Sequence, residues 1–133
     1  MANNESGAIQ LKFKDNGTSI SMLKSGRLTR SDVAALIKEA LARHRTVDLN
    51  GRDLHNLDLS KLSLGRADLS NANLSHSNLS DATLFSANLH NTDFSSANLA
   101  HINFSYADLS SANLDGANMY YAILMKTILP ASM

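Results

Sequence analysis

The sequence predicts a repeat protein, a solenoid of short repeats preceded by a small non-repetitive module. Two observations predict this fold class. An apolar residue recurs every five positions from Leu49 to Leu129, seventeen times without a gap, and a small residue, usually Ala, precedes most of these by two positions. Because an α-helix has a period of 3.6 and a strand a period of 2, a period of five fits neither element. The 46 residues that precede the repeats lack this period.

The repeats are five-residue units in which Ala67-Asp68-Leu69 and Ala72-Asn73-Leu74 are typical cores. The stretch from Val47 to Ala131 resembles the pentapeptide-repeat family of the A(D/N)LXX type. The resemblance implies a mainly β fold, a right-handed quadrilateral parallel β-helix with four pentapeptides per coil and one on each face. Seventeen units then make a little over four coils, in a domain of residues 47–131 followed by a two-residue tail, 132–133.

Each unit of this helix points its central apolar residue and the preceding Ala into the core, where both kinds of side chain stack between coils. Asp and Asn suit the corners, because their side chains accept hydrogen bonds from nearby backbone in tight turns. The pattern breaks at both ends. Arg52, Leu57 and Leu62 replace Ala, which indicates a wider or incompletely closed first coil, and Ile123 and Ile128 replace the last corner Asp or Asn.

Residues 1–46 are expected to form a β-hairpin followed by one α-helix. Apolar and polar residues alternate from Ile9 to Lys14, and Asn16-Gly17 is a favoured two-residue turn that pairs Phe13 with Ile20 and Leu11 with Met22. Thr29-Arg30-Ser31-Asp32 has the pattern of a capping box that begins a helix over residues 30–44. The expected buried stripe of this helix comprises Val33, Leu36, Ile37, Ala40 and Leu41, and Arg43, His44 and Arg45 follow at its C-terminus. This module is either a cap over the first coil or a separate partner-binding unit.

Composition excludes several classes of protein. The 12 Lys and Arg residues balance 12 Asp and Glu residues, and no cysteine is present, so a basic nucleic-acid-binding protein, a disulfide scaffold and a cysteine-ligated metal are all disfavoured. The N-terminus lacks a secretory signal and the longest apolar run, Met119 to Met125, is too short to span a bilayer. We therefore expect a cytoplasmic protein that binds neither nucleic acid nor membrane. The balance hides an asymmetry, because residues 1–46 carry +4 and residues 47–133 carry −4.

No catalytic, cofactor-binding or metal-binding motif is found. The histidines of the repeats, His55, His76, His90 and His101, fall on three different faces and do not converge with carboxylates into a set that could bind a metal. A coil filled with side chains also has no pocket that could exclude water from a reaction. We therefore expect a protein that is not an enzyme and needs no cofactor.

Assigning each pentapeptide to a face distinguishes the surfaces of the rod. Two faces are acidic. The aspartates of the first are Asp48, Asp68 and Asp108, and those of the second are Asp53 and Asp93. On the fourth face, Ser63, Thr83, Asn103 and Ile123 replace the acids, and aromatic, apolar and basic residues project outward. This candidate interaction surface comprises Phe85, Tyr106, Met125, Arg66 and Lys126. The alternative is that these are surface apolar residues without a function.

Two functions fit this description. The first is a protein–protein interaction rod, in the manner of a bacterial or phage effector or inhibitor whose protein partner the sequence does not identify. The alternative is a DNA mimic that inhibits or protects a DNA-binding enzyme such as a type II topoisomerase, which the resemblance to gyrase-targeting pentapeptide-repeat proteins suggests. We also expect a homodimer through the C-terminal coil, because those relatives pair there and an open coil end exposes apolar residues. The expected contact comprises Met119, Tyr120, Tyr121, Ile123 and Ile128. In the rival monomer, the two tyrosines fold over the coil end.

Overall fold

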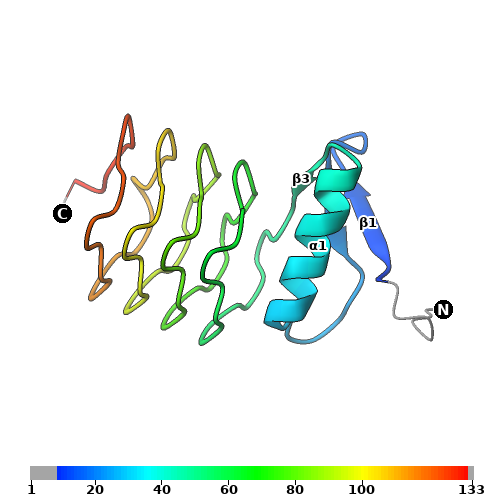
Figure 1. Ribbon diagram of the computed structural model, residues 1–133, viewed down its shortest axis with the longest axis horizontal. Helices are drawn as coiled ribbons and strands as arrows, with labels where there is room; N and C mark the ends of the chain where they lie inside the picture. Colours follow the sequence, from blue (N-terminus) through cyan, green and yellow to red (C-terminus); the bar gives the residue numbers. More distant parts are fainter. Residues whose placement is uncertain (1–8, 132–133) are drawn as a thin grey trace.

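The computed structural model describes residues 9–131, which form a rod with a small α/β module packed on one end (Figure 1). The module contains β1 (Leu11–Lys14), β2 (Ser19–Met22), α1 (Arg30–Ala42) and β3 (Thr46–Val47) in chain order. The rod follows from β3 and ends at the opposite side of the molecule. The expected tail, residues 132–133, and the start of the N-terminal module, residues 1–8, lie outside the described residues.

The hairpin has the register that the sequence predicts. Strands β1 and β2 pair antiparallel with Phe13 opposite Ile20 and Leu11 opposite Met22. The turn between them has a left-handed backbone at three consecutive residues, with φ of +56° at Asp15, +58° at Asn16 and +87° at Gly17. Asparagine and glycine tolerate this conformation best, so the dipeptide fixes the register of the hairpin.

Helix α1 begins with the predicted capping box and ends earlier than expected. The Thr29 side chain accepts a hydrogen bond from the Asp32 backbone N–H, while the Asp32 carboxylate accepts one from the Thr29 N–H. The helix ends at Ala42, so the cluster of Arg43, His44 and Arg45 lies beyond its last turn instead of within it. The predicted stripe is also too wide, because Val33, Leu36, Ile37 and Ala40 are buried but Leu41 is 69% exposed.

The repeats wind into a β-helix whose coils repeat every 20 residues. Parallel bridges join residues 20 apart on each of four faces, for example Asp48 to Asp68 and Asp53 to Asn73. Backbone hydrogen bonds follow the same spacing, as when the N–H of Leu54 donates to the carbonyl of Asn73 at 2.7 Å. Each face pairs through single bridges, so the rod consists of four narrow ladders separated by turns.

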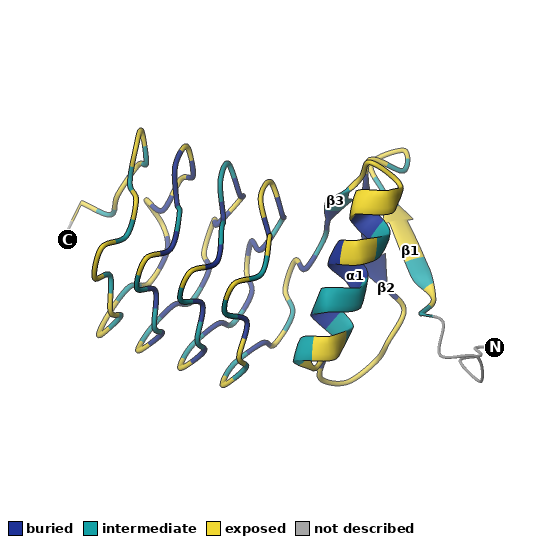
Figure 2. Ribbon diagram, viewed as in Figure 1, coloured by how far each residue is buried: buried dark blue, intermediate teal, exposed yellow. Residues whose placement is uncertain are grey.

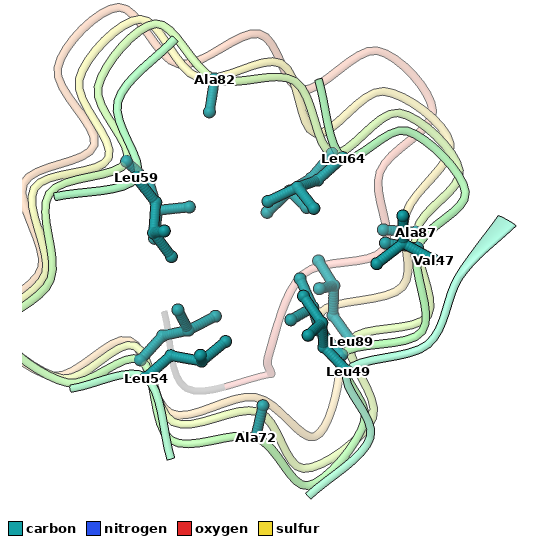
Figure 3. Close-up of a cluster of buried hydrophobic side chains, with 14 of the residues drawn as sticks. Val47, Leu49, Leu54, Leu59, Leu64, Ala72, Ala82, Ala87 and Leu89 are labelled. Atoms are coloured by element: carbon teal, nitrogen blue, oxygen red, sulfur yellow. The ribbon is translucent and has the colours of Figure 1, made fainter. Parts of the chain in front are cut away.

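The core of the rod is the set of inward side chains that the repeat predicts. Leu49, Leu54, Leu59 and Leu64 point inward from the four faces, with small side chains such as Ala72 between them (Figure 3). The central residues from Leu49 to Leu109 are at most 1% exposed, and two of them, Phe94 and Phe104, contact each other edge to face at 5.7 Å. Layers of large and small side chains thus fill the coil without a channel.

The corners explain the Asp and Asn of the repeat. In corner after corner, the Asp or Asn Oδ1 accepts a hydrogen bond from the backbone N–H two residues later, as from Ser75 to Asn73 at 3.0 Å. The second residue after the central apolar residue is left-handed at most corners, with φ of +63° at Asn71 and +72° at Gly51. The side-chain acceptor stabilises this tight turn, which accounts for the polar residue between Ala and Leu.

The module continues the first face of the rod. Strand β2 pairs antiparallel with β1 and parallel with β3. The first residue after β3, Asp48, bridges to Asp68 of the following coil. Of the residues that replace Ala in the first coil, Leu57 and Leu62 are partly buried against the core. The third, Arg52, reaches into the module instead, and its guanidinium donates to the carbonyls of Met22 and Lys24 at 2.6 and 2.9 Å.

The opposite end of the rod is open. In Figure 2 the last described coil is exposed or intermediate at nearly every position, whereas the earlier coils have a buried interior. Inward residues there, including Leu114, Met119 and Leu124, are only partly buried, because no further coil packs on them within residues 9–131. Within the described residues, the N–H groups of Met119 and Leu124 also lack the inter-coil acceptor that their counterparts one coil earlier have.

Candidate functional site

The fourth face is the ladder formed by Ser63, Thr83, Asn103 and Ile123, which parallel bridges connect in that order. The corner that follows this face brings together the five residues of the predicted interaction surface. We call this set the aromatic corner. It comprises Arg66, Phe85, Tyr106, Met125 and Lys126.

Three residues of the aromatic corner are in contact along the rod axis. The Phe85 and Tyr106 rings meet edge to face with centroids 5.5 Å apart, and the Arg66 guanidinium lies 5.8 Å from the Phe85 ring centroid. Coil stacking holds them in place, because the Arg66 N–H donates to the Phe85 carbonyl and the Tyr106 N–H to the Met125 carbonyl. Phe85 is therefore partly covered by its neighbours, whereas Tyr106 and Met125 are 51% and 60% exposed.

The charge of the aromatic corner is positive and uncompensated within the described residues. Neither Arg66 nor Lys126 forms an ion pair there, unlike Lys14 and Arg30 of the module. The outward positions of the fourth face carry Ser, Thr, Asn and Ile and no carboxylate. An apolar and aromatic surface with two free cations suits a partner with apolar and acidic groups.

The two acidic faces have the predicted ladders but less free negative charge than the sequence suggests. Among their five aspartates, Asp48 and Asp68 both bind the Lys14 ammonium, at 3.0 and 3.3 Å, and Asp53 contacts the His55 ring at 2.5 Å. Asp93 and Asp108 use one carboxylate oxygen to accept the backbone N–H of their own corner. Lys14 therefore partly neutralises the first acidic face in its first two coils.

The pKa values of Lys14 and Asp68 are both shifted. The hydrogen bond to Asp48 raises the pKa of Lys14 above its usual value. Burial acts to raise the pKa of Asp68, but hydrogen bonds from the Ser70 hydroxyl, the Ser70 N–H and Lys14 outweigh it, so the pKa of Asp68 is lowered. Each shift stabilises the charged form, which indicates a favourable contact between the module and the rod.

Sequence reasoning missed most of these contacts between the module and the rod. Besides Lys14 and Arg52, Arg30 binds the carbonyl and carboxylate of Asp58, and Arg27 donates to the His55 carbonyl. The basic residues of the module thus face the acidic first coil. The one available signal was Arg52, a long basic side chain at a position where the repeat calls for Ala.

The residues of the predicted dimer contact surround the open coil end. Tyr120 and Tyr121 are 65% and 66% exposed, and Ile123 and Ile128 are 50% and 55% exposed, whereas Met119 points inward and is partly buried. The Tyr121 ring stacks on His101 of the preceding coil at 5.1 Å, and Tyr120 packs on Tyr121 at 4.3 Å. Tyr121 is therefore directed back along the rod.

The histidines of the rod lie at three of its corners, with His55 and His76 at the same corner on successive coils. His55 is beside Asp53 and His90 beside the Ser111 hydroxyl at 2.9 Å, while His101 stacks on Tyr121. Among residues 9–131, no three His, Asp or Glu side chains lie close enough to hold a metal ion. No helix of that same part has the length and apolar character needed to cross a bilayer.

Comparison with known proteins agrees with this architecture. The family model for pentapeptide repeats matches in eight copies, over residues 46–75, 63–99 and 92–129. The pentapeptide repeat protein alr5209 from Nostoc PCC 7120 has a TM-score of 0.62 and 31% identity, over 74% of this chain and 86% of that chain. Rfr23, a pentapeptide repeat protein from the cyanobacterium Cyanothece 51142, has a TM-score of 0.60 and 28% identity over 62% of this chain.

This chain spans 57% of the length of the Rfr23 structure. A more distant structure is that of QnrB1, a plasmid-mediated fluoroquinolone resistance protein, with a TM-score of 0.36 and 18% identity over 62% of each chain. No curated protein matches this chain by sequence.

Proposed function

Because this chain belongs to the pentapeptide repeat family, a group of right-handed β-helix solenoids, we propose that it is a non-enzymatic protein-binding rod. The rod has about four coils, and the N-terminal module serves as the cap of the first. The aromatic corner binds the partner. One observation carries this proposal: Phe85, Tyr106 and Met125 are apolar, lie outside the core and form a contiguous surface with Arg66.

The cap role of the module is supported by its contacts. Arg52 of the first coil holds the end of the hairpin, while Lys14 and Arg30 of the module bind aspartates of the rod. The apolar side chains of the module cover the first core layer, because Ile20 belongs to the same buried cluster as Leu49. Lys14 and Arg30 are also paired with the rod, so these two basic side chains are not free for a nucleic acid or another partner.

The pairing of Asp48 and Asp68 with Lys14 also favours the aromatic corner over DNA mimicry. A DNA mimic needs extended negative faces, and in this rod Lys14 pairs with two of the three aspartates of the first acidic face. A gyrase supercoiling assay at micromolar protein tests this directly. We expect neither inhibition nor protection, and either effect would favour the mimic.

The partner surface is tested by replacing Phe85 and Tyr106 together by Ser in affinity capture. Because neither ring belongs to the core of the rod, we expect a melting temperature close to that of the wild type and a strong loss of the captured partner. The matched control replaces Lys61 and His76, which are exposed at other corners, by Ser. If the double variant captures the same protein in the same amount as this control, the aromatic corner does not bind it.

We also propose that two copies pair through their C-terminal coils. Five exposed side chains surround the open end, Tyr120, Tyr121, Ile123, Ile128 and Leu129, with exposed fractions between 38% and 66%. At about 200 Å² for a large side chain they expose roughly 550 Å². Together with the partly buried Met119 and Leu124, this approaches the ~800 Å² per partner of a typical stable interface.

Light scattering at tens of micromolar tests this association. We expect twice the monomer mass of 14.4 kDa, and a value near 14.4 kDa would exclude the dimer at that concentration. In a dimer, Ile128→Asp should restore the monomer mass, because a buried charge without a partner is strongly unfavourable. The control is Ser80→Asp, which introduces the same charge on the side of the rod away from this end.

A further inference from the structure

A groove of about 520 Å³ lies between the hairpin and the first coil. Its walls carry four basic residues: Lys12 and Lys14 from β1, Lys24 from the segment after β2, and Arg52 from the first coil. On β1, Lys12 and Lys14 alternate with Leu11 and Phe13, so their side chains leave the sheet on the face opposite to these apolar residues. This groove is separate from the aromatic corner, which begins at Arg66, after the fourth face of the first coil.

The positive charge of the groove is only partly compensated. Lys14 binds Asp48 and Asp68, and Lys24 binds Asp32 at 2.6 Å. Within the described residues, Lys12 and Arg52 form no ion pair with a carboxylate. The Arg52 guanidinium is held by two backbone carbonyls, which fix its position without neutralising its charge. Two uncompensated cations therefore line one groove, and one of them is already immobilised.

The groove also offers hydrogen-bond acceptors. The Asp48 carboxylate, the Ser21 hydroxyl and the Asn50 side chain lie among the basic residues. A phosphate-rich ligand has few donors to satisfy such acceptors. No aromatic residue lines the groove, so it lacks the stacking surfaces that single-stranded nucleic acids use. A peptide, by contrast, has backbone N–H groups for the acceptors and carboxylates for the cations.

We propose that this groove binds an extended acidic peptide segment of a partner protein. Acidic side chains of the segment pair with Lys12 and Arg52, and its backbone N–H groups donate to Asp48 and Asn50. A volume of about 520 Å³ is within the usual range of pockets that hold small ligands, so the groove takes only a few residues. The rod then has a second binding site at its capped end, independent of the aromatic corner.

Fluorescence anisotropy with a fluorescein-labelled hexaglutamate peptide tests the proposal at low salt. We expect saturable binding that weakens as salt is added. Lys12→Glu should weaken binding by at least about fivefold, since it replaces an attractive ion pair by a repulsive one. Lys12→Gln is the milder variant and should weaken it less. Lys38→Glu on the exposed side of α1 is the matched control, because it changes the net charge equally outside the groove.

Three outcomes overturn the proposal. An equal loss of affinity in Lys12→Glu and Lys38→Glu, or no binding of hexaglutamate at all, would show that the groove is not a specific site. Tighter binding of a hexathymidine oligonucleotide than of hexaglutamate would assign the groove to nucleic acid. Changes in amide chemical shift provide a readout besides affinity. On adding hexaglutamate, we expect the amide signals of Ser21 and Asn50 to move and that of Lys38 to stay unchanged.

Discussion

Replacing Leu79 by Ala measures how much one inward residue stabilises the rod. Leu79 is fully buried between coils, so the change removes three carbon atoms from the core and leaves a cavity. At about 0.8 kcal/mol per buried methylene, the lost burial is ~2.4 kcal/mol. The cavity raises the expected loss in the free energy of unfolding to about 3–4 kcal/mol, within the range known for buried leucines.

Leu129→Ala is the matched control, because it makes the same chemical change at the central position of a repeat at the open end of the rod. Leu129 is 38% exposed and borders solvent, so no closed cavity forms when its side chain is shortened. Scaling the burial to the part of the side chain that is covered gives about 1.5 kcal/mol at most. The two variants should therefore differ by about 2 kcal/mol.

Urea titration followed by circular dichroism gives both free energies from the midpoint and slope of the transition. Each variant should be measured at low and high protein concentration, since a dimer at the C-terminal end would bury Leu129 and make its loss concentration-dependent. Equal losses for Leu79→Ala and Leu129→Ala at the lowest concentration would refute the assignment of a closed core and an open end.

Three further predictions concern single contacts. Arg52→Met removes the hydrogen bonds to the hairpin carbonyls, so amide exchange in β2 should accelerate while exchange in the last coils stays unchanged. Because the pKa of Asp68 is lowered, its contribution to stability is complete above the usual aspartate pKa, near 4, and is lost as the pH falls below that value. In Asp68→Asn, the free energy of unfolding should therefore fall less steeply with decreasing pH in this acidic range. Thr92→Val keeps the volume but removes the buried hydroxyl bond to the Leu69 carbonyl at 2.8 Å, which should cost about 1 kcal/mol in urea.

The parts of the fold that follow from local pattern could be predicted from the sequence. The five-residue period assigns every inward position, and the bridges join the residues that the face assignment places together, such as Thr83 and Asn103. The hairpin register and the capping box were predicted for the same reason, because the turn dipeptide and Thr29 act on residues within a few positions. The prediction that Leu41 is buried was wrong, because helical spacing alone does not show how wide a stripe of the helix the sheet covers.

The junction between the module and the rod could not be predicted. Arg52 binds backbone carbonyls some 30 residues earlier in the chain. Since every residue has a backbone carbonyl, the residue types do not show which carbonyl accepts this bond. Lys14 reaches two aspartates on successive coils, which requires that β2 pair with β3 and that the coil then continue the same ladder. The free charge of the acidic faces depends on this docking, and the proposed preference for a protein-binding rod over a DNA mimic rests on that charge.

The two isoleucines of the last coil have different physical explanations, and this difference leads to a last prediction. At 128 an Asp or Asn would have nothing to bind, because the residue two positions later is Pro130, which lacks an N–H. At 123 that residue is Met125, whose N–H has no such side-chain acceptor, whereas the equivalent N–H of Ser105 is bound by Asn103 at 2.9 Å.

Ile123 is also 50% exposed, so within one molecule it gives up a corner hydrogen bond and buries little surface. Ile123→Asn should therefore raise the free energy of unfolding of the monomer, by about 0.5–1.5 kcal/mol, since it restores the corner acceptor. In the proposed dimer the same change removes an apolar contact and should shift light scattering toward the monomer. If Ile123→Asn lowers the free energy of unfolding and leaves the mass from light scattering unchanged, Ile123 stabilises the coil itself and does not contact a second copy.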